Sequence, residues 1–268
     1  MQETSTSNTF QERMEAIFQI LSRQGTVRVT ELQDLLGVSD MTIRRCLNAM
    51  AADGLIRRTH GGAAAIDGGE SRFMQMRNNL NTNVKALLAD RAVDLMPEGG
   101  SIFLDSGTTC FAVAKRLAAG TKRMNVFTDS IKITRELQSV RYLHTILLGG
   151  TLCDDMTTLD GPLTAEAASR ISLDLCLFSA DGFNEERLDN KYLAGATTKK
   201  IVISRSQRSM FICDSSKYSQ RCCFMFCGWD EVDIFLTDSF LPAAARRVIA
   251  EKGVEVHVVA NHVSEVNG

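Results

Sequence analysis

The N-terminal part of the chain alternates apolar stripes with glycine breaks. Over residues 11–24, apolar side chains recur at helical spacing: Met14, Ile17, Phe18 and Leu21. Gly25 ends this predicted helix, and residues 26–29 form a short β-prone run. A second helix is predicted to start near Thr30 and to break at Gly37. Its inward residues are expected to be Leu32, Leu35 and Leu36.

A third helix follows, which Ser39 or Asp40 can cap by accepting free backbone N–H groups. The inward stripe of this helix is Ile43, Leu47 and Met50, and a different stripe carries Met41, Arg44, Arg45 and Asn48. Beyond residues 53–54, a charged extended pair over residues 55–60 is closed by Gly61 and Gly62. This order of helices, short turn and basic hairpin predicts a winged helix-turn-helix.

The chemistry of the outward stripe suits DNA. Arginine and asparagine read guanine and adenine edges in the major groove, and arginines of the wing suit phosphates. We therefore expect contacts to DNA from Ser39, Met41, Thr42, Arg44, Arg45, Asn48, Arg57, Arg58 and His60. Two arginines on a solvated helix face would be a simpler explanation, but the full order of elements favours DNA binding.

The rest of the chain predicts a second domain. Residues 63–82 read as a linker between a domain at 1–62 and one at 83–268, which begins with a helix over 84–96. Short apolar strands then alternate with helical patterns, at 102–104, 126–127, 146–148, 175–178, 210–212, 234–236 and 254–259. Because strands buried on both faces are typical of parallel sheets, we predict a mainly parallel α/β fold.

Almost every predicted strand ends in a polar loop, at residues 105–109, 128–130, 149–151, 179–182 and 214–217. Ligands of open α/β sheets bind beyond this edge, so the loops predict one shared pocket. In the first loop, Gly107 permits close approach of the backbone, and Ser106, Thr108 and Thr109 offer hydroxyls. A helix beginning there adds free N–H groups, which makes a phosphate cradle without a Walker lysine.

Charged residues in the other loops complete this expectation. Asp105 would repel a phosphate, so we assign it to a sugar hydroxyl or to shaping the loop, and Lys217 to the counter-charge. Selectivity for a small ligand would come from Thr128, Asp129 and Asp181. The same residue types are also ordinary turn and cap residues, and it is their concentration on one edge that favours a site.

Composition narrows the class of protein. The chain has 268 residues, of which 44% are hydrophobic and 23% charged, as in soluble globular proteins. No apolar run approaches a membrane span and the first residues are polar, so a cytoplasmic protein without a membrane partner is expected. The eight cysteines lack CxxC spacing and several lie in apolar runs, which favours reduced thiols. We expect no cofactor, no metal and no catalytic residue. A net charge of −2 leaves room for a local basic patch.

Together these residues resemble the DeoR family of bacterial transcriptional regulators. The resemblance rests on VSDMTIRR at 38–45, RRTHGGA at 57–63, DSGTT at 105–109, GGT at 149–151 and DSSK at 214–217, and it covers nearly the whole chain. It implies a DNA-binding repressor of a sugar-catabolic operon, a sensor domain similar to ribose-5-phosphate isomerase, release by a phosphorylated sugar, and a homo-oligomer. Lys200 falls where the family commonly has a lysine.

The effector-binding residues expected from the loops and the resemblance are Asp105, Ser106, Gly107, Thr108, Thr109, Thr128, Asp129, Gly149, Gly150, Asp181, Lys200, Asp214 and Lys217. Three departures from the family pattern stand out. Cys46 replaces an aspartate, Asp129 replaces an asparagine, and residues 194–198 lack an acidic residue. The added charge of Asp129 would disfavour a nearby phosphate and favour hydroxyl recognition, so the effector can differ from those of other members.

Two other classes of function remain. The chain could be a sugar-phosphate isomerase or deaminase with Asp105, Asp181, Asp214 and Lys217 as acids or bases, although no acid/base pair falls on one loop. An adaptor that uses the winged helix for protein contacts is the third class. It predicts no steep salt dependence of DNA binding, whereas arginines that contact phosphates must produce one.

Overall fold

The computed structural model of this chain describes residues 10–66, 81–153 and 156–260, and residues 67–80 of the expected linker lie outside these ranges. The chain divides into two compact units, Met1–Leu80 and Asn81–Gly268. Both units carry their own apolar core.

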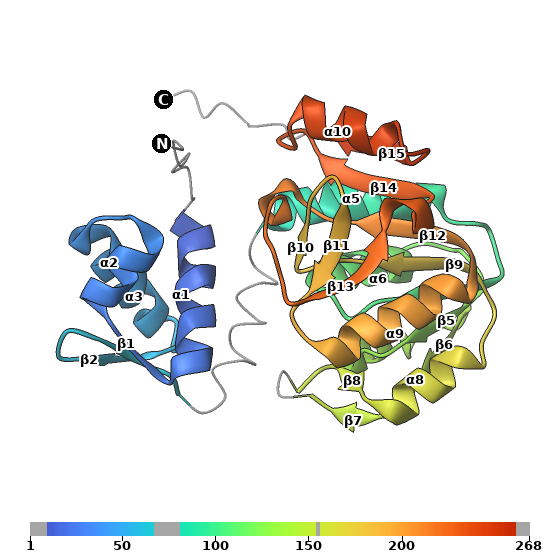
Figure 1. Cartoon of the computed structure of the whole chain (residues 1–268). Helices are drawn as coiled ribbons and strands as arrows, with labels where there is room; N and C mark the ends of the chain where they lie inside the picture. The colour runs from blue at the N-terminus through green and yellow to red at the C-terminus, as the bar shows by residue number, and fades with distance from the viewer. Residues whose placement is uncertain (1–9, 67–80, 154–155, 261–268) are drawn as a thin grey trace, which may run out of the picture. The chain divides into compact units, whose positions relative to one another are not determined.

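The first unit has the three helices and the wing that the sequence predicts. Helices α1 (Phe10–Gln24), α2 (Val29–Leu36) and α3 (Asp40–Ala52) are followed by the hairpin of β2 (Arg57–Thr59) and β3 (Gly62–Ala64). Strand β1 (Thr26–Arg28) pairs antiparallel with β3, which lies in the centre of the sheet β1-β3-β2. Figure 1 shows these helices and strands in blue.

Two details of this unit correct the sequence analysis. Strand β3 runs to Ala64, so the winged fold continues past residue 62, where the domain was expected to end. Leu35, expected to face inward, is 58% exposed, whereas Leu32 is buried. The central strand needs glycine at position 62, because an added Cβ there would lie 1.9 Å from the carbonyl oxygen of Val27.

The second unit is a seven-stranded sheet of the kind that the apolar runs predict. Its strands are β4 (Ser101–Leu104), β5 (Met124–Thr128), β6 (Leu143–Leu147), β9 (Leu173–Phe178), β12 (Ser206–Ile212), β14 (Ile234–Asp238) and β15 (Glu255–Val259). They lie in the order β15-β14-β12-β9-β4-β5-β6, and every neighbouring pair is parallel. The expected mainly parallel α/β fold is therefore confirmed.

Helices cover both faces of this sheet, which explains why its strands are apolar on both sides (Figure 1). In β4, Ile102 and Leu104 face a core shared with α5 (Thr82–Leu95), α6 (Thr108–Ala118) and α7 (Ile131–Leu137). Phe103, between them, faces the core of α8 (Pro162–Ser169), α9 (Leu193–Ser204) and α10 (Ala243–Ala250). Alternate residues of one strand thus enter opposite cores.

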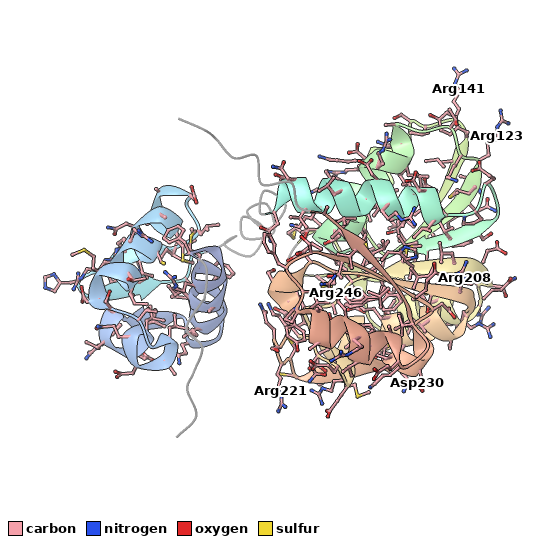
Figure 2. All side chains as sticks on the ribbon, turned by 90° about the horizontal axis from the view of Figure 1, so that it is seen from above. Arg123, Arg141, Arg208, Arg221, Asp230 and Arg246 are labelled. Carbon is pink, nitrogen blue, oxygen red and sulfur yellow. The ribbon has the colours of Figure 1, made fainter. Side chains whose placement is uncertain are left out.

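The polar loops lie at the carboxyl edge of the sheet, whereas exposed arginines lie at the opposite edge. Figure 2 shows the side chains of Arg123 and Arg141 extending from the surface. These two exposed residues precede β5 and β6, so they lie at the amino edge. The arginines at the amino edge therefore do not belong to the site described below.

Short strands that the sequence analysis missed surround the carboxyl edge. A hairpin joins β7 (Thr151–Leu152) to β8 (Leu159–Asp160). A second sheet, also antiparallel, consists of β10 (Gly182–Phe183), β11 (Arg187–Asn190) and β13 (Phe224–Gly228). A single 3-10 turn, η1 (Ser215–Lys217), follows β12. Within the described residues, no helix has the length and apolar character needed to span a membrane.

Candidate functional site

Helix α3 presents a polar face built around its first turn. The Ser39 hydroxyl accepts a hydrogen bond from the backbone N–H of Thr42 at 3.4 Å and shares another with the Thr42 hydroxyl at 2.9 Å. Met41 is 78% exposed, and Arg44 and Asn48 are exposed one and two turns further along. Residues at this spacing share one helix face, so the stripe that the sequence predicts is present on the surface.

Intramolecular contacts hold two of the expected DNA-binding arginines. Arg44 forms an ion pair with Asp40, one turn earlier in α3. The Arg45 guanidinium lies 4.9 Å from the centre of the Phe10 ring, in a cation–π contact with α1. Both arginines remain exposed, so these contacts orient the side chains without burying their charge.

The wing contributes a different arrangement. The Nη1 atom of Arg58 donates a hydrogen bond to the carbonyl oxygen of Gly62 at 2.6 Å, across the hairpin. Arg58 is thus half-buried and stabilises the hairpin, while Arg57 and His60 are exposed. Among the wing residues expected to contact DNA, Arg57 and His60 are therefore more accessible than Arg58.

Cys46 lies on the opposite side of α3 from this face. Its side chain is buried in the core of the first unit, and burial raises the pKa of its thiol. The nearby charges of Arg13 and Arg45 act in the other direction. The replacement of an aspartate by Cys46 therefore changes the interior of the helical unit and removes no group from its surface.

In the second unit, the order of strands in the sheet has a topological switch point between β4 and β9. Strands β5 and β6 follow β4 toward one side of the sheet, and β12, β14 and β15 follow β9 toward the other. At such a switch point the loops diverge and leave a crevice at the carboxyl edge. Asp105 follows β4 and Ser179 follows β9, so these two residues flank the switch point.

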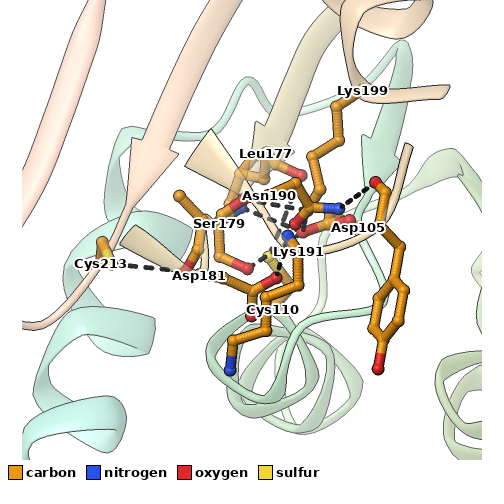
Figure 3. A network of polar contacts seen from close by, with 11 residues as sticks. Asp105, Cys110, Leu177, Ser179, Asp181, Asn190, Lys191, Lys199 and Cys213 are labelled. Carbon is orange, nitrogen blue, oxygen red and sulfur yellow. Dashed lines mark hydrogen bonds and ion pairs between the residues drawn. The ribbon is translucent and has the colours of Figure 1, made fainter. Parts of the chain in front are cut away.

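A buried ion pair spans the switch point. The Nζ atom of Lys199, in α9, donates to Oδ2 of Asp105 at 2.6 Å and to the carbonyl oxygen of Ser179 at 2.9 Å. The same Oδ2 accepts the backbone N–H and the hydroxyl of Ser179, both at 3.0 Å. Figure 3 shows Asp105, Ser179 and Lys199 converging. Asp105 therefore shapes the loop, the second of the roles considered from sequence.

Charge and burial oppose one another at this pair. Burial works to lower the pKa of Lys199, but the charge and the hydrogen bond of Asp105, together with the charge of Asp181, outweigh it and raise that pKa. Burial raises the pKa of the neighbouring Cys110 thiol, and the charge of Asp105 raises it further. Lys199 is consequently a fixed cation, and Cys110 is a neutral thiol beneath the crevice.

The lysine that the structure brings to the switch point is Lys199, the neighbour of the Lys200 expected from sequence. Lys200 is exposed on α9, whereas Lys199 is buried against Asp105. The charge of Lys200 acts instead on the thiol of Cys227, in β13. Two adjacent lysines differ by roughly 100° around a helix, and the sequence alone could not decide which of them turns inward.

The loop after β4 starts helix α6 at Gly107, which is its N-cap residue. A Cβ added to Gly107 would lie 2.1 Å from the Ser179 hydroxyl oxygen, so a larger residue would displace that hydroxyl from its hydrogen bond to Asp105. Thr108 and Thr109 are buried in the first turn, and Ser106 is half-buried. The turn offers backbone N–H groups and the positive end of the helix dipole at the crevice, as the sequence predicts.

The loop after β5 brings a second carboxyl to the same edge. Thr128 is fully buried, and its hydroxyl oxygen accepts the backbone N–H of Ser130 at 3.1 Å. Burial, followed by the charge of Asp105, raises the pKa of Asp129 well above its ordinary value. Asp129 therefore lies within the electrostatic reach of the pair at the switch point.

The missed β7–β8 hairpin adds Asp160 to the site. The Thr164 hydroxyl donates to the carbonyl oxygen of Gly149 at 2.7 Å, and Gly150 adopts φ +150°. A Cβ at Gly150 would meet the Thr164 hydroxyl oxygen at 2.0 Å, so the hairpin can start only from glycine. Oδ1 of Asp160 accepts the hydroxyl of Thr198 at 3.4 Å, next to Lys199 in α9.

Comparison with known proteins agrees with both parts of this description. A family model described as the DeoR-like helix-turn-helix domain matches residues 13–68, and one described as the DeoR C terminal sensor domain matches residues 80–239. The chain belongs to the DeoR family. Its first unit is the helix-turn-helix domain and its second unit is the sensor domain of a transcriptional regulator.

Curated relatives share nearly the whole length of this regulator. The HTH-type transcriptional regulator GlpR of Haloferax volcanii is 31% identical over 247 residues, which cover 91% of this chain and 96% of that one. The lactose phosphotransferase system repressor of Staphylococcus epidermidis is 28% identical over 232 residues, 85% of this chain and 92% of that one. Among solved structures, ribose 5-phosphate isomerase A from Neisseria gonorrhoeae aligns over 54% of this chain and 55% of that chain, at 22% identity and a TM-score of 0.39.

The DSSK motif of the sensor domain holds its own loop together. Oδ1 of Asp214 accepts the backbone N–H of Ser216 at 3.1 Å and the side-chain amide of Asn81 at 3.5 Å. Lys217, at the end of η1, is buried. Asp181 accepts a hydrogen bond from the backbone N–H of Lys191 at 3.1 Å, and its charge helps to raise the pKa of Lys199. Asp214 is thus a structural member of the loop.

Proposed function

We propose that this regulator represses a carbohydrate-catabolic operon and leaves its operator when a phosphorylated sugar binds at the carboxyl edge of the sensor sheet. The observation that carries the proposal is the switch point. A fixed cation, a helix N-terminus and several buried hydroxyls meet there, at the place where α/β sheets bind ligands.

The chemistry of the crevice suits a phosphate attached to a polar body. The first turn of α6 supplies N–H groups next to Thr108 and Thr109, which favours an anion. The carboxyls of Asp129 and Asp160 come from other elements, directly after β5 and at the end of β8. Carboxyls favour groups that donate hydrogen bonds. The phosphate would therefore bind at α6 and the sugar toward β5 and β8.

On the DNA side, the exposed face of α3 enters the major groove and the wing lies along the backbone. Met41, Arg44 and Asn48 would meet base edges, and Arg57 and His60 would meet phosphates. A repressor with one helix-turn-helix per chain gains affinity by pairing two half-sites, so the regulator acts as a homo-oligomer. The relative named as a lactose phosphotransferase system repressor is consistent with a role in sugar metabolism.

We further propose that the crevice senses and does not catalyse. A general acid or base needs a carboxyl that is free to exchange protons with a substrate. Oδ2 of Asp105 is instead bound by Lys199 and by two groups of Ser179. Asp214 is bound by Ser216 and Asn81.

The test is fluorescence anisotropy of the full-length protein on DNA upstream of its own operon. Binding should weaken steeply with salt, because arginines that contact phosphates release counterions. A panel of sugar phosphates and the matching free sugars is then titrated into the complex. Release by one phosphorylated sugar, and not by its free form, supports the proposal. Binding that is insensitive to salt, or release by the free sugar alone, contradicts it.

A further inference from the structure

Within the described residues, a buried carboxyl oxygen of Asp129 has no hydrogen-bond partner. Asp129 is only 5% exposed, and its Oδ1 atom has no hydrogen-bond partner among the residues that the structure describes. Buried polar atoms in folded proteins are almost always paired, since an unpaired one loses its hydration without compensation. A ligand group that donates a hydrogen bond would satisfy this atom.

The surroundings of Asp129 specify the charge of that group. The carboxyls of Asp105 and Asp160 and the ammonium of Lys199 act on Asp129 electrostatically. Lys199 is already bound to Asp105 at 2.6 Å and to the Ser179 carbonyl at 2.9 Å. Three carboxyls therefore share one cation, and that cation is turned toward Asp105.

The backbone holds Asp129 and Asp160 on adjoining segments. The N–H of Leu159 donates to the carbonyl oxygen of Asp129 at 2.8 Å, and the N–H of Ile131 donates to that of Thr157 at 2.8 Å. These bonds tie β8 to the end of β5, so Asp160 follows directly after a residue bonded to Asp129. Asp160 is then held from the other side by Thr198, at 3.4 Å.

From this arrangement, and resting on the proposed function, we propose that the effector is an amino sugar phosphate whose ammonium group binds between Asp129 and Asp160. An ammonium donates three hydrogen bonds and supplies the positive charge that the carboxyls lack. A hydroxyl would satisfy Oδ1 but leave the excess negative charge uncompensated. A phosphate at this position would add to that charge, which places the phosphate at the first turn of α6.

Proton binding supports the same assignment. Burial and the charge of Asp105 raise the pKa of Asp129, with Asp160 adding to the effect and Lys199 opposing it. The buried Cys110 thiol also senses the charge of Asp129. A bound ammonium would act in the direction of Lys199 and favour the ionised carboxyl, so binding of an amino ligand would release a proton.

The experiment compares matched ligands on the full-length protein bound to its operator. Glucosamine 6-phosphate is paired with glucose 6-phosphate, and galactosamine 6-phosphate with galactose 6-phosphate, beside the wider panel of sugar phosphates. One amino member should release DNA at a concentration at least about tenfold lower than its hydroxyl partner. Release by a sugar phosphate without an amino group, at an equal or lower concentration, overturns the inference and leaves the proposed function standing. If no sugar phosphate releases DNA, the proposed function fails as well.

An isosteric variant gives a second and independent test. Asp129→Asn retains the shape of the side chain and removes its negative charge. The affinity for the amino ligand, measured by calorimetry on the full chain, should fall about tenfold or more, while the affinity for its hydroxyl partner should stay or rise. Asp94→Asn, at an exposed position of α5, is the matched control and should change neither affinity. An equal gain for both ligands in Asp129→Asn contradicts the ammonium site.

Discussion

At the scale of single residues, the sensor domain depends on side chains whose partners come from distant parts of the chain. The sequence motif DSGTT singled out Asp105 but could not identify its cation, since Lys199 and Lys200 are adjacent in α9. Only the packing of α9 on the sheet turns Lys199 inward to Asp105. The sequence analysis also missed Asp160, because it lies in β8, a strand of only two residues.

The buried pair makes a prediction that separates the two lysines. Lys199→Met would leave the Asp105 carboxylate buried without its cation, and breaking such a pair costs about 3–5 kcal/mol. The urea midpoint of the full chain should fall accordingly, and Lys200→Met, at the exposed neighbour, should change stability by less than about 0.5 kcal/mol. The double variant Asp105→Asn with Lys199→Met should recover part of the loss. Equal effects of the two single lysine variants would contradict the buried ion pair.

Asp129 makes a prediction about pH. Its pKa in the folded protein is raised, chiefly by burial, so the folded state binds this proton more tightly than the unfolded state. The carboxyl therefore costs stability once the pH exceeds its ordinary value, and the cost grows as the pH rises toward the folded pKa. Asp129→Asn should raise Tm by about 2–4 °C per kcal/mol recovered, and the gain at about pH 8 should exceed the gain at about pH 5.

This pH prediction is measured without effector, by thermal unfolding of both proteins across the pH range. Asp94→Asn again serves as the control, because Asp94 is exposed on α5. A gain in Tm that is the same at both pH values would contradict a raised pKa. If Asp129→Asn stabilises the protein, Asp129 itself lowers stability. Binding residues are often kept at the expense of stability, which explains its presence in a sensor.

At the scale of elements, most of the fold follows from apolar patterning. Strands such as Leu173–Phe178 enter two cores at once, so nearly every position is apolar and the run is visible in the sequence. The hairpin of β7 and β8 has strands of two residues, which carry no pattern. Leu35 was assigned inward because it fits a helical stripe, yet α2 exposes it. Periodicity identifies the apolar face of a helix, but it does not show how many residues of that face the core buries.

Substitutions in the recognition helix and in the wing should weaken DNA binding in different ways. Arg44→Ala removes a group expected at base edges, and it should cost about 1–3 kcal/mol on the operator and much less on unrelated DNA. Arg57→Ala removes an exposed wing charge, so it should weaken both DNAs alike and reduce the salt slope by about 1. Anisotropy titrations on both DNAs over a range of salt concentrations measure each effect. An Arg44→Ala variant that binds both DNAs equally more weakly would remove Arg44 from sequence reading.

At the scale of the whole molecule, regulation requires that the sensor domain influence the residues that lead to the helix-turn-helix domain. Asn81 is the first residue of the second unit. It adopts a left-handed conformation with φ 53°, which asparagine tolerates better than most residues. Its side-chain amide donates to Asp214 at 3.5 Å, in the loop that also carries Lys217. The effector edge is thereby connected to Asn81, the N-cap residue of α5.

This connection predicts a variant that binds effector but responds poorly. Asn81→Gly keeps the left-handed backbone and removes the bond to Asp214, so effector affinity should remain within about threefold while the coupling to DNA release falls by about 1 kcal/mol. Coupling is obtained from the ratio of DNA affinities with and without saturating effector. Asn83→Ala, at an exposed position of the same helix, should leave coupling intact. Wild-type coupling in Asn81→Gly would exclude this route and direct attention to other contacts of α5. A loss of effector binding itself would instead make Asn81 part of the binding loop, because affinity and coupling are separate quantities and only the second measures transmission.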